Sequence, residues 1–159
     1  MMQYYVDLVK HFIIANSRHG THSPFVYGLA DQVIYKKANL GSVAVSFPSS
    51  FSWRYRKLLG AMLSHMGVNT LTTLYSEQPG AAIWIDPRHD PMANLFDLLE
   101  AGKIIIVHEP YRSKQLWNQW NADPRVIVSI DLFHVGLLLQ RDGQRKENFL
   151  LRYPYWNDK

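Results

Sequence analysis

Apolar side chains in the first third of the chain recur every three or four residues, the spacing at which one face of an α-helix repeats. The pattern predicts one helix over residues 2–16, a second over residues 24–37 and a third that ends near residue 65. The residues expected to face inward are Tyr5, Leu8, Val9, Phe12 and Ile13 in the first helix, Phe25, Val26, Leu29, Val33 and Ile34 in the second, and Trp53, Leu58, Leu59 and Met62 in the third.

Helix-starting signals support the second and third helices. Ser23 followed by Pro24 is an N-cap with proline at the first helical position, and Ser49 or Ser50 provides a cap for the third helix. Small and polar residues over positions 38–48 form the only plausible internal linker.

From residue 81 onwards, short apolar runs typical of buried strands alternate with helical patterns. Strands are predicted over residues 71–74, 81–86, 103–107, 125–130, 135–140 and 149–153, and helices over residues 91–101 and 113–122, the first of these between Asp90 and Gly102 as caps. Such alternation predicts a parallel sheet with right-handed crossovers. Short links after Asp131 and at Asp142–Gly143 predict antiparallel strands at the end.

The length of the chain favours one domain. Its 159 residues, 47% of them hydrophobic, suffice for one core and are too few for two ordinary ones. We expect a single domain over 1–159, with an N-terminal helical hairpin and linker over 1–48 and a reduced α/β core over 49–159.

Composition excludes several kinds of chemistry. The sequence contains no cysteine, which removes disulfides, iron–sulfur clusters and thiolate zinc sites. The apolar runs are shorter than the ~20 residues of a membrane span, and the first residues lack the pattern of a signal peptide. We therefore expect a cytoplasmic protein. The net charge of +4 comes from scattered Lys and Arg, most of which we expect at the solvated surface.

The link between the third helix and the strand at 81–86 is unusually short. Only fourteen residues, 67–80, lie there, whereas one βαβ unit takes roughly 30 residues. In a ligand-binding α/β protein, this is where a glycine-rich turn and further βαβ units would hold a nucleotide. The usual ligand-binding apparatus is therefore reduced or missing.

Three blocks of sequence resemble one known family. RHGTHSPF at 18–25, IDPRH at 85–89 and SIDLFHVG at 129–136 are similar to motifs of a bacterial subgroup of class I S-adenosylmethionine-dependent methyltransferases. The resemblance covers about 1–66 and 81–156, and its N-terminal signature includes Arg18, His19, His22 and Ser23. It implies a truncated Rossmann-like methyltransferase sheet with a C-terminal antiparallel hairpin, because the last strand of that family inserts antiparallel to its neighbours.

The chain departs from the family pattern at the cofactor site. The family has a Gly-x-x-x-Gly type loop after its first strand and an acid for the cofactor ribose after its second, and neither is found here. Glu77 could substitute for that acid, but its surroundings favour a turn. No residue is therefore assigned to S-adenosylmethionine, and the gap at 67–80 is interpreted as an internal deletion.

Strand ends supply the candidate catalytic residues, namely Asp86, His89, His108 and Glu109. The family has an acid pair where this chain has His108 and Glu109, a change that suggests relaxed constraint after loss of the cofactor. These residues, together with His19 and His22, could in principle bind a divalent metal. Their spacing matches no strong metal motif, so no metal site is predicted.

Three functions remain open at this stage. The leading hypothesis is a degenerate methyltransferase-like protein that acts as a non-catalytic binding or assembly module and forms a homodimer through a sheet edge left uncovered by the deletion, with exposed aromatic residues such as Trp156. The alternative is an S-adenosylmethionine-dependent methyltransferase with a shortened cofactor site. A second alternative is a nucleic-acid-binding domain that uses Arg54, Arg56 and Lys57 beside Trp53.

Overall fold

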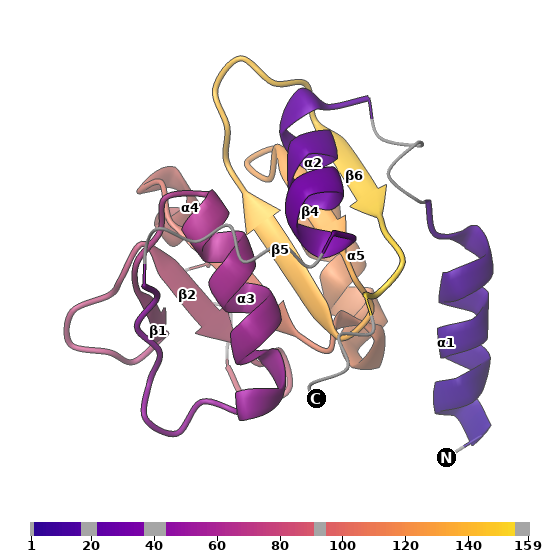
Figure 1. Cartoon of the computed structure of the whole chain (residues 1–159), viewed down its shortest axis with the longest axis horizontal. Coiled ribbons are helices and arrows are strands. Elements are labelled where there is room, and N and C mark those ends of the chain that lie inside the picture. The colour runs from indigo at the N-terminus through magenta and orange to yellow at the C-terminus, as the bar shows by residue number, and fades with distance from the viewer. Residues whose placement is uncertain (1, 17–21, 37–43, 91–94, 155–159) are drawn as a thin grey trace.

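The structure is a computed structural model of the 159-residue chain that describes residues 2–16, 22–36, 44–90 and 95–154. Its centre is a six-stranded mixed sheet with the strand order β1-β2-β3-β5-β4-β6 (Figure 1). The strands are β1 (Leu71–Thr73), β2 (Ala82–Ile85), β3 (Ile104–His108), β4 (Val128–Asp131), β5 (Val135–Leu139) and β6 (Glu147–Leu150). The predicted α/β class is confirmed.

Strand directions agree with the sequence except in one pairing. Strands β1, β2 and β3 are parallel, and β5 runs antiparallel to both of its neighbours, β3 and β4. The expected pairing of β5 with the last strand across Asp142–Gly143 is wrong, because both edges of β5 are already occupied. The chain instead crosses to the free edge of β4, where β6 pairs in parallel.

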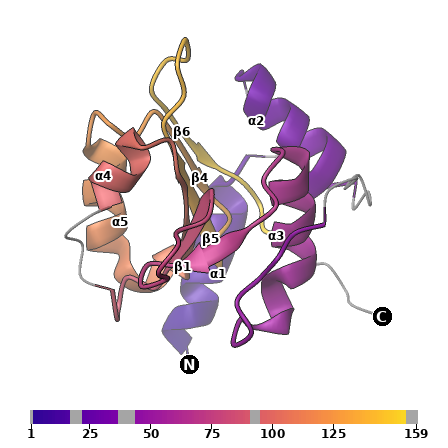
Figure 2. The same cartoon turned by 90° about the vertical axis from the view of Figure 1, so that its left-hand side faces the viewer.

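Helices cover both faces of the sheet and make three layers (Figure 2). One face is covered by α3 (Trp53–His65) and by α2 (Pro24–Leu29), which continues into a π-helical turn over Ala30–Ile34. The other face is covered by α4 (Leu95–Glu100) and α5 (Lys114–Ala122), the latter preceded by a 3₁₀ turn over Pro110–Ser113. Alternate strand residues face the two layers, so that Ile105 joins the core under α4 and α5, whereas Ile106 joins the core under α2 and α3.

Two tryptophans hold α5 to the sheet. Trp117 and Trp120, three positions apart on this helix, are both buried. Trp117 lies so close to the backbone of β5 that a methyl group at Gly136 would be 2.6 Å from the ring atom Cη2. Position 136 therefore excludes a side chain. Trp156 lies outside the described residues.

The helix caps agree with the sequence at α2 and differ at α3. Ser23 caps α2 by accepting a hydrogen bond from the backbone N–H of Val26 at 3.4 Å. The cap of α3 is Ser52 rather than Ser49 or Ser50, since its hydroxyl accepts from the N–H of Arg54. Its predicted inward residues are buried except for Trp53, which is 73% exposed in the first turn.

The first helix, α1 (Met2–Ile14), lies at the side of the molecule (Figure 1). Its predicted inward face is wrong: among the expected residues Tyr5, Val9, Phe12 and Ile13 are all exposed. The helix docks through its other side, where His11 is buried, and it contacts the turn between β4 and β5. The expected helical hairpin is also wrong, because α2 packs on α3 through its continuation over Ala30–Ile34.

The linker expected at 38–48 is described only from residue 44 onwards, and the start of the helix expected at 91–101 lies outside the described residues. Gly102 ends that helix with a positive φ of 76°, as predicted for a C-terminal glycine. None of the helices in the described part of the chain combines the length and the apolar content needed to cross a membrane.

Candidate functional site

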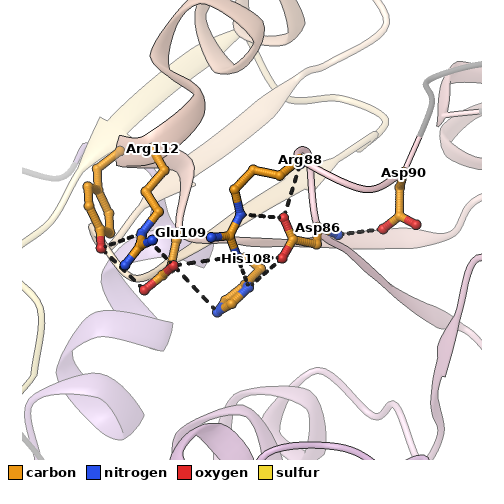
Figure 3. Close-up of polar contacts among 7 residues, drawn as sticks. Asp86, Arg88, Asp90, His108, Glu109 and Arg112 are labelled. Carbon is orange, nitrogen blue, oxygen red and sulfur yellow. Dashed lines mark hydrogen bonds and ion pairs between the residues drawn. The ribbon is translucent and has the colours of Figure 1, made fainter.

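Parallel pairing of β2 and β3 brings three of the four candidate residues together at one edge of the sheet (Figure 3). Asp86 directly follows β2, His108 is the last residue of β3, and Glu109 follows it. With Arg88 and Arg112 they form what we call the acid cluster. The fourth candidate, His89, lies exposed in the turn after β2, and its backbone N–H donates to the carbonyl of Asp86.

Asp86 is held by Arg88 and His108. The Nε and Nη2 atoms of Arg88 donate to the two carboxylate oxygens at 3.0 and 2.7 Å, and Nδ1 of His108 donates to Oδ2 at 3.0 Å. Burial opposes ionisation of this carboxyl, but the hydrogen bonds from Arg88 and His108 outweigh it and hold the pKa of Asp86 well below its usual value. The Asp86 carboxyl is therefore ionised near neutral pH and is a poor proton acceptor.

Glu109 is held by its own turn. Nε of Arg112 lies 2.8 Å from Oε2, and the hydroxyl of Tyr111 donates to Oε1 at 3.2 Å. The residue is buried and adopts a left-handed backbone with φ of 43°, a conformation that costs a non-glycine residue about 1 kcal/mol or more. Its N–H donates to the carbonyl of His134, which fixes this conformation at the end of β3.

The two arginines were not predicted from the sequence. Both lie two or three positions after the acid that they bind, within the same turn. The spacing of Asp86 and Arg88, an acid followed two positions later by an arginine, could have predicted the first pair. The Asp86 carboxylate accepts a hydrogen bond from the backbone N–H of Arg88, and this turn places the Arg88 side chain beside the carboxylate. Arg18, part of the N-terminal signature, lies outside the described residues.

A cavity of about 300 Å³ opens next to His108, on the side of β2 that faces α3. Its walls include the aromatic side chains of Phe51, Tyr55 and Trp84, and the Trp84 and His108 rings lie 5.0 Å apart. Burial raises the pKa of the Tyr55 hydroxyl to about 12, so the cavity wall carries a neutral phenol at physiological pH. This volume lies at the lower end of the ~300–1,000 Å³ typical of ligand pockets.

The short segment between α3 and β2 forms a single brief strand and a turn. β1 is an edge strand of the described sheet, and it is followed by a turn in which the hydroxyl of Ser76 accepts from the N–H of Thr73. Glu77 is exposed in this loop, in agreement with the turn interpretation. Gly80 lies against the carbonyl of Thr70, where an added Cβ would be 2.9 Å from the oxygen.

Of the histidines considered as metal ligands, His22 is exposed and His19 lies outside the described residues. Within the described residues no group of three or more His, Asp or Glu side chains is arranged so that it could hold a metal ion. His108 contacts Asp86 on one ring nitrogen and lies 4.0 Å from Glu109 on the other.

Of the basic residues on α3, Arg54 and Lys57 are exposed as expected, but Arg56 is half-buried. The Arg56 guanidinium donates to the carbonyls of Phe51 and Pro48 and thereby holds the loop that leads into α3. Tyr55 is buried. One of the three basic residues considered for a polyanion contact is thus partly used for structure.

Searches with family models, curated proteins and solved structures find no match to this chain. The functional argument therefore depends on the site itself.

Proposed function

We propose that this protein is a degenerate methyltransferase-like domain that acts as a non-catalytic binding or assembly module. The observation that carries the proposal is the pairing within the acid cluster. Asp86 and Glu109 stand at the sheet edge where an α/β protein presents its chemistry, and each is neutralised by an arginine of its own turn. A ligand would have to displace these ion pairs before it could use either acid.

The sheet supports this descent. In class I methyltransferases the last strand inserts antiparallel to its neighbours, and β5 does so between β3 and β4. At the opposite edge, β1 is the terminal strand, so the described sheet ends where the family would continue into its cofactor-binding units. The absence of cysteine suits a reducing compartment, and we place the protein in the cytoplasm.

Thermal unfolding with and without S-adenosylmethionine tests the proposal. A ligand bound only by the folded state at 100 times its Kd would add about 2.7 kcal/mol of stability. We expect no change in the unfolding midpoint at millimolar ligand. A saturable rise in the midpoint would contradict the non-catalytic proposal.

A second candidate is a surviving S-adenosylmethionine-dependent methyltransferase, and the cavity beside His108 favours it. If this function holds, the thermal shift depends on the aromatic wall. Trp84→Ala, which removes part of that wall, should then abolish the shift, whereas Trp53→Ala, on an exposed ring outside the cavity, should leave it intact. Equal shifts in both variants would place the ligand elsewhere.

A further inference from the structure

An apolar stripe on α1 is exposed, and among the described residues the Arg152 guanidinium contacts it at one end, 4.7 Å from the centre of the Phe12 ring. The stripe consists of Met2, Tyr5, Val6, Val9, Phe12 and Ile13, which are between 39% and 81% exposed. At 3.6 residues per turn, these positions fall within an arc of about 120° centred on Val9. We call this set the outer stripe.

The spacing of the outer stripe is that of a helix–helix seam. Met2, Tyr5, Val9 and Phe12 follow the 3-4-3 intervals of the a and d positions of a heptad, and Val6 and Ile13 flank them. A straight seam of this kind matches another helix. With Val6 and Ile13 the arc is as wide as the apolar face that a helix ordinarily buries, so the stripe is wide enough to be covered by a partner.

The opposite side of α1 is fixed to the domain, so the helix cannot rotate to bury the outer stripe. The hydroxyl of Tyr4 lies 3.1 Å from Nε2 of His134, and Nε2 of His11 lies 3.4 Å from a carboxylate oxygen of Asp131. Nζ of Lys114 lies 2.6 Å from Asp7 Oδ1. The docked side is therefore aromatic and polar, and the helix exposes the apolar side that a helix ordinarily buries.

The area and the charge of the stripe fit a second copy of this chain. With about 150–250 Å² for each of its two aromatic side chains and less for the aliphatic ones, the exposed parts of the stripe offer on the order of 600 Å² per copy. Complete burial of the stripe in two copies reaches the ~1,200 Å² at which stable interfaces begin. The stripe itself contains no charged residue, and the Arg152 guanidinium that lies over Phe12 is near its end, so a two-fold axis at Val9 brings no like charges together. A membrane-surface helix would be rich in Lys and Arg, and Lys10 is the only basic residue exposed on α1.

We propose that two copies of this chain associate through the outer stripes of their α1 helices. This proposal names the partner of the assembly module proposed above and therefore rests on it. This interface differs from the sheet edge that was expected from the sequence to form the dimer. Isolated β-bridges pair Ser46 with Thr70, next to β1, and Asn16 with Leu151, next to β6, so each edge of the described sheet already has a partner at one end.

Light scattering of the full chain after size exclusion tests the dimer. We expect the wild type to have about twice the 18.5 kDa mass of the monomer. Val9→Lys places a charge at the centre of the stripe and should give a monomer. Ile14→Lys is the matched control, because Ile14 is 67% exposed on the same helix outside the stripe, and this variant should remain a dimer.

Far-ultraviolet circular dichroism melts of both variants establish that they remain folded, which the exposure of both positions favours. A monomeric wild type at high concentration would overturn the proposal, as would a Val9→Lys variant that stays dimeric. A monomer that co-sediments with phosphatidylserine vesicles would overturn it in favour of a lipid surface. Binding of S-adenosylmethionine would contradict the proposed function without affecting the dimer, so the two claims can fail separately.

Discussion

Asp86 and Glu109 are each paired with an arginine that follows within three positions, so the charge balance of the acid cluster is local to two turns. The turn after β2 neutralises Asp86, and the turn after β3 neutralises Glu109. Arg88, which also lies 3.7 Å from Glu109, and His108, through its contact with Asp86, link the two halves. At this scale the cluster resembles a set of structural ion pairs, in which each acid has the partner that it needs when buried.

The Asp86 pairing predicts a pH-dependent contribution to stability. Because the folded pKa of Asp86 lies below its usual 3.8, its contribution is present above that pH and is lost as the pH falls towards the folded pKa. Asp86→Asn should therefore cost about 1–2 kcal/mol at pH 7, after allowance for solvent screening. Urea unfolding at several pH values should show this deficit shrinking below pH 3.8. The control is Glu77→Gln in the exposed loop, which should change stability by less than ~0.5 kcal/mol.

Replacement of glycine by alanine should change the stability of the protein in opposite directions at two positions. Gly136→Ala would force a methyl group against Trp117 in the core and should destabilise the protein by about 1–3 kcal/mol. Gly28→Ala, in α2, meets no atom within 4 Å and should stabilise it by up to ~1 kcal/mol. Urea denaturation of the two variants measures both changes. Equal effects would show that the close approach of Trp117 is not rigid.

At the scale of elements, hydrophobic spacing predicted the bounds of α1 better than its orientation. Tyr5, Val9, Phe12 and Ile13 form the more apolar side, yet the helix docks through the side that bears Tyr4 and His11. Spacing could not distinguish the two sides, because ring contacts and hydrogen bonds at specific partners decide the docking. The exposed side then becomes the evidence for a partner.

Other parts of the fold likewise separate into features that local sequence predicts and features that depend on the tertiary arrangement. Strand ends placed Asp86, His108 and Glu109 correctly, because parallel neighbours end at one edge. The pairing of β6 was not predictable from its turn, since it depends on which edges of the sheet are already occupied. The cavity beside His108 also depends on the approach of α3 to β2, which no local pattern specifies.

The docking of α1 should weaken in acid through His134. This residue is buried beside Tyr4 and Tyr153, and burial, together with nearby positive charges, lowers the pKa of its imidazole to about 4. Between pH 6.5 and about 4 the unfolded imidazole takes up a proton and the folded one does not, so stability falls as pH falls.

His134→Gln removes this titration and keeps a polar partner for Tyr4. The stability difference between wild type and variant should therefore decrease by about 1–3 kcal/mol from pH 7 to pH 4. Chemical denaturation at each pH measures the difference, and groups common to both proteins cancel. Parallel pH profiles would show that His134 takes up its proton equally in the folded and unfolded protein, and would contradict the lowered pKa.

At the scale of the whole molecule, the sheet edge at β1 and the surface of α1 bear on different functions. Near β1 the described sheet ends without a glycine-rich loop, and the acids beside it are paired internally. Beside the turn between β4 and β5, α1 presents an apolar stripe that the domain leaves largely exposed. Together these features favour association over methyl transfer as the function of this fold.

Isothermal titration of the full chain with S-adenosylmethionine tests this account most directly. The account predicts only the heat of dilution up to millimolar ligand, because the acid cluster is neutralised and no cofactor-binding loop follows β1 in the described structure. Saturable heat with a stoichiometry near one ligand per chain, abolished by Trp84→Ala and retained by Trp53→Ala, would contradict it.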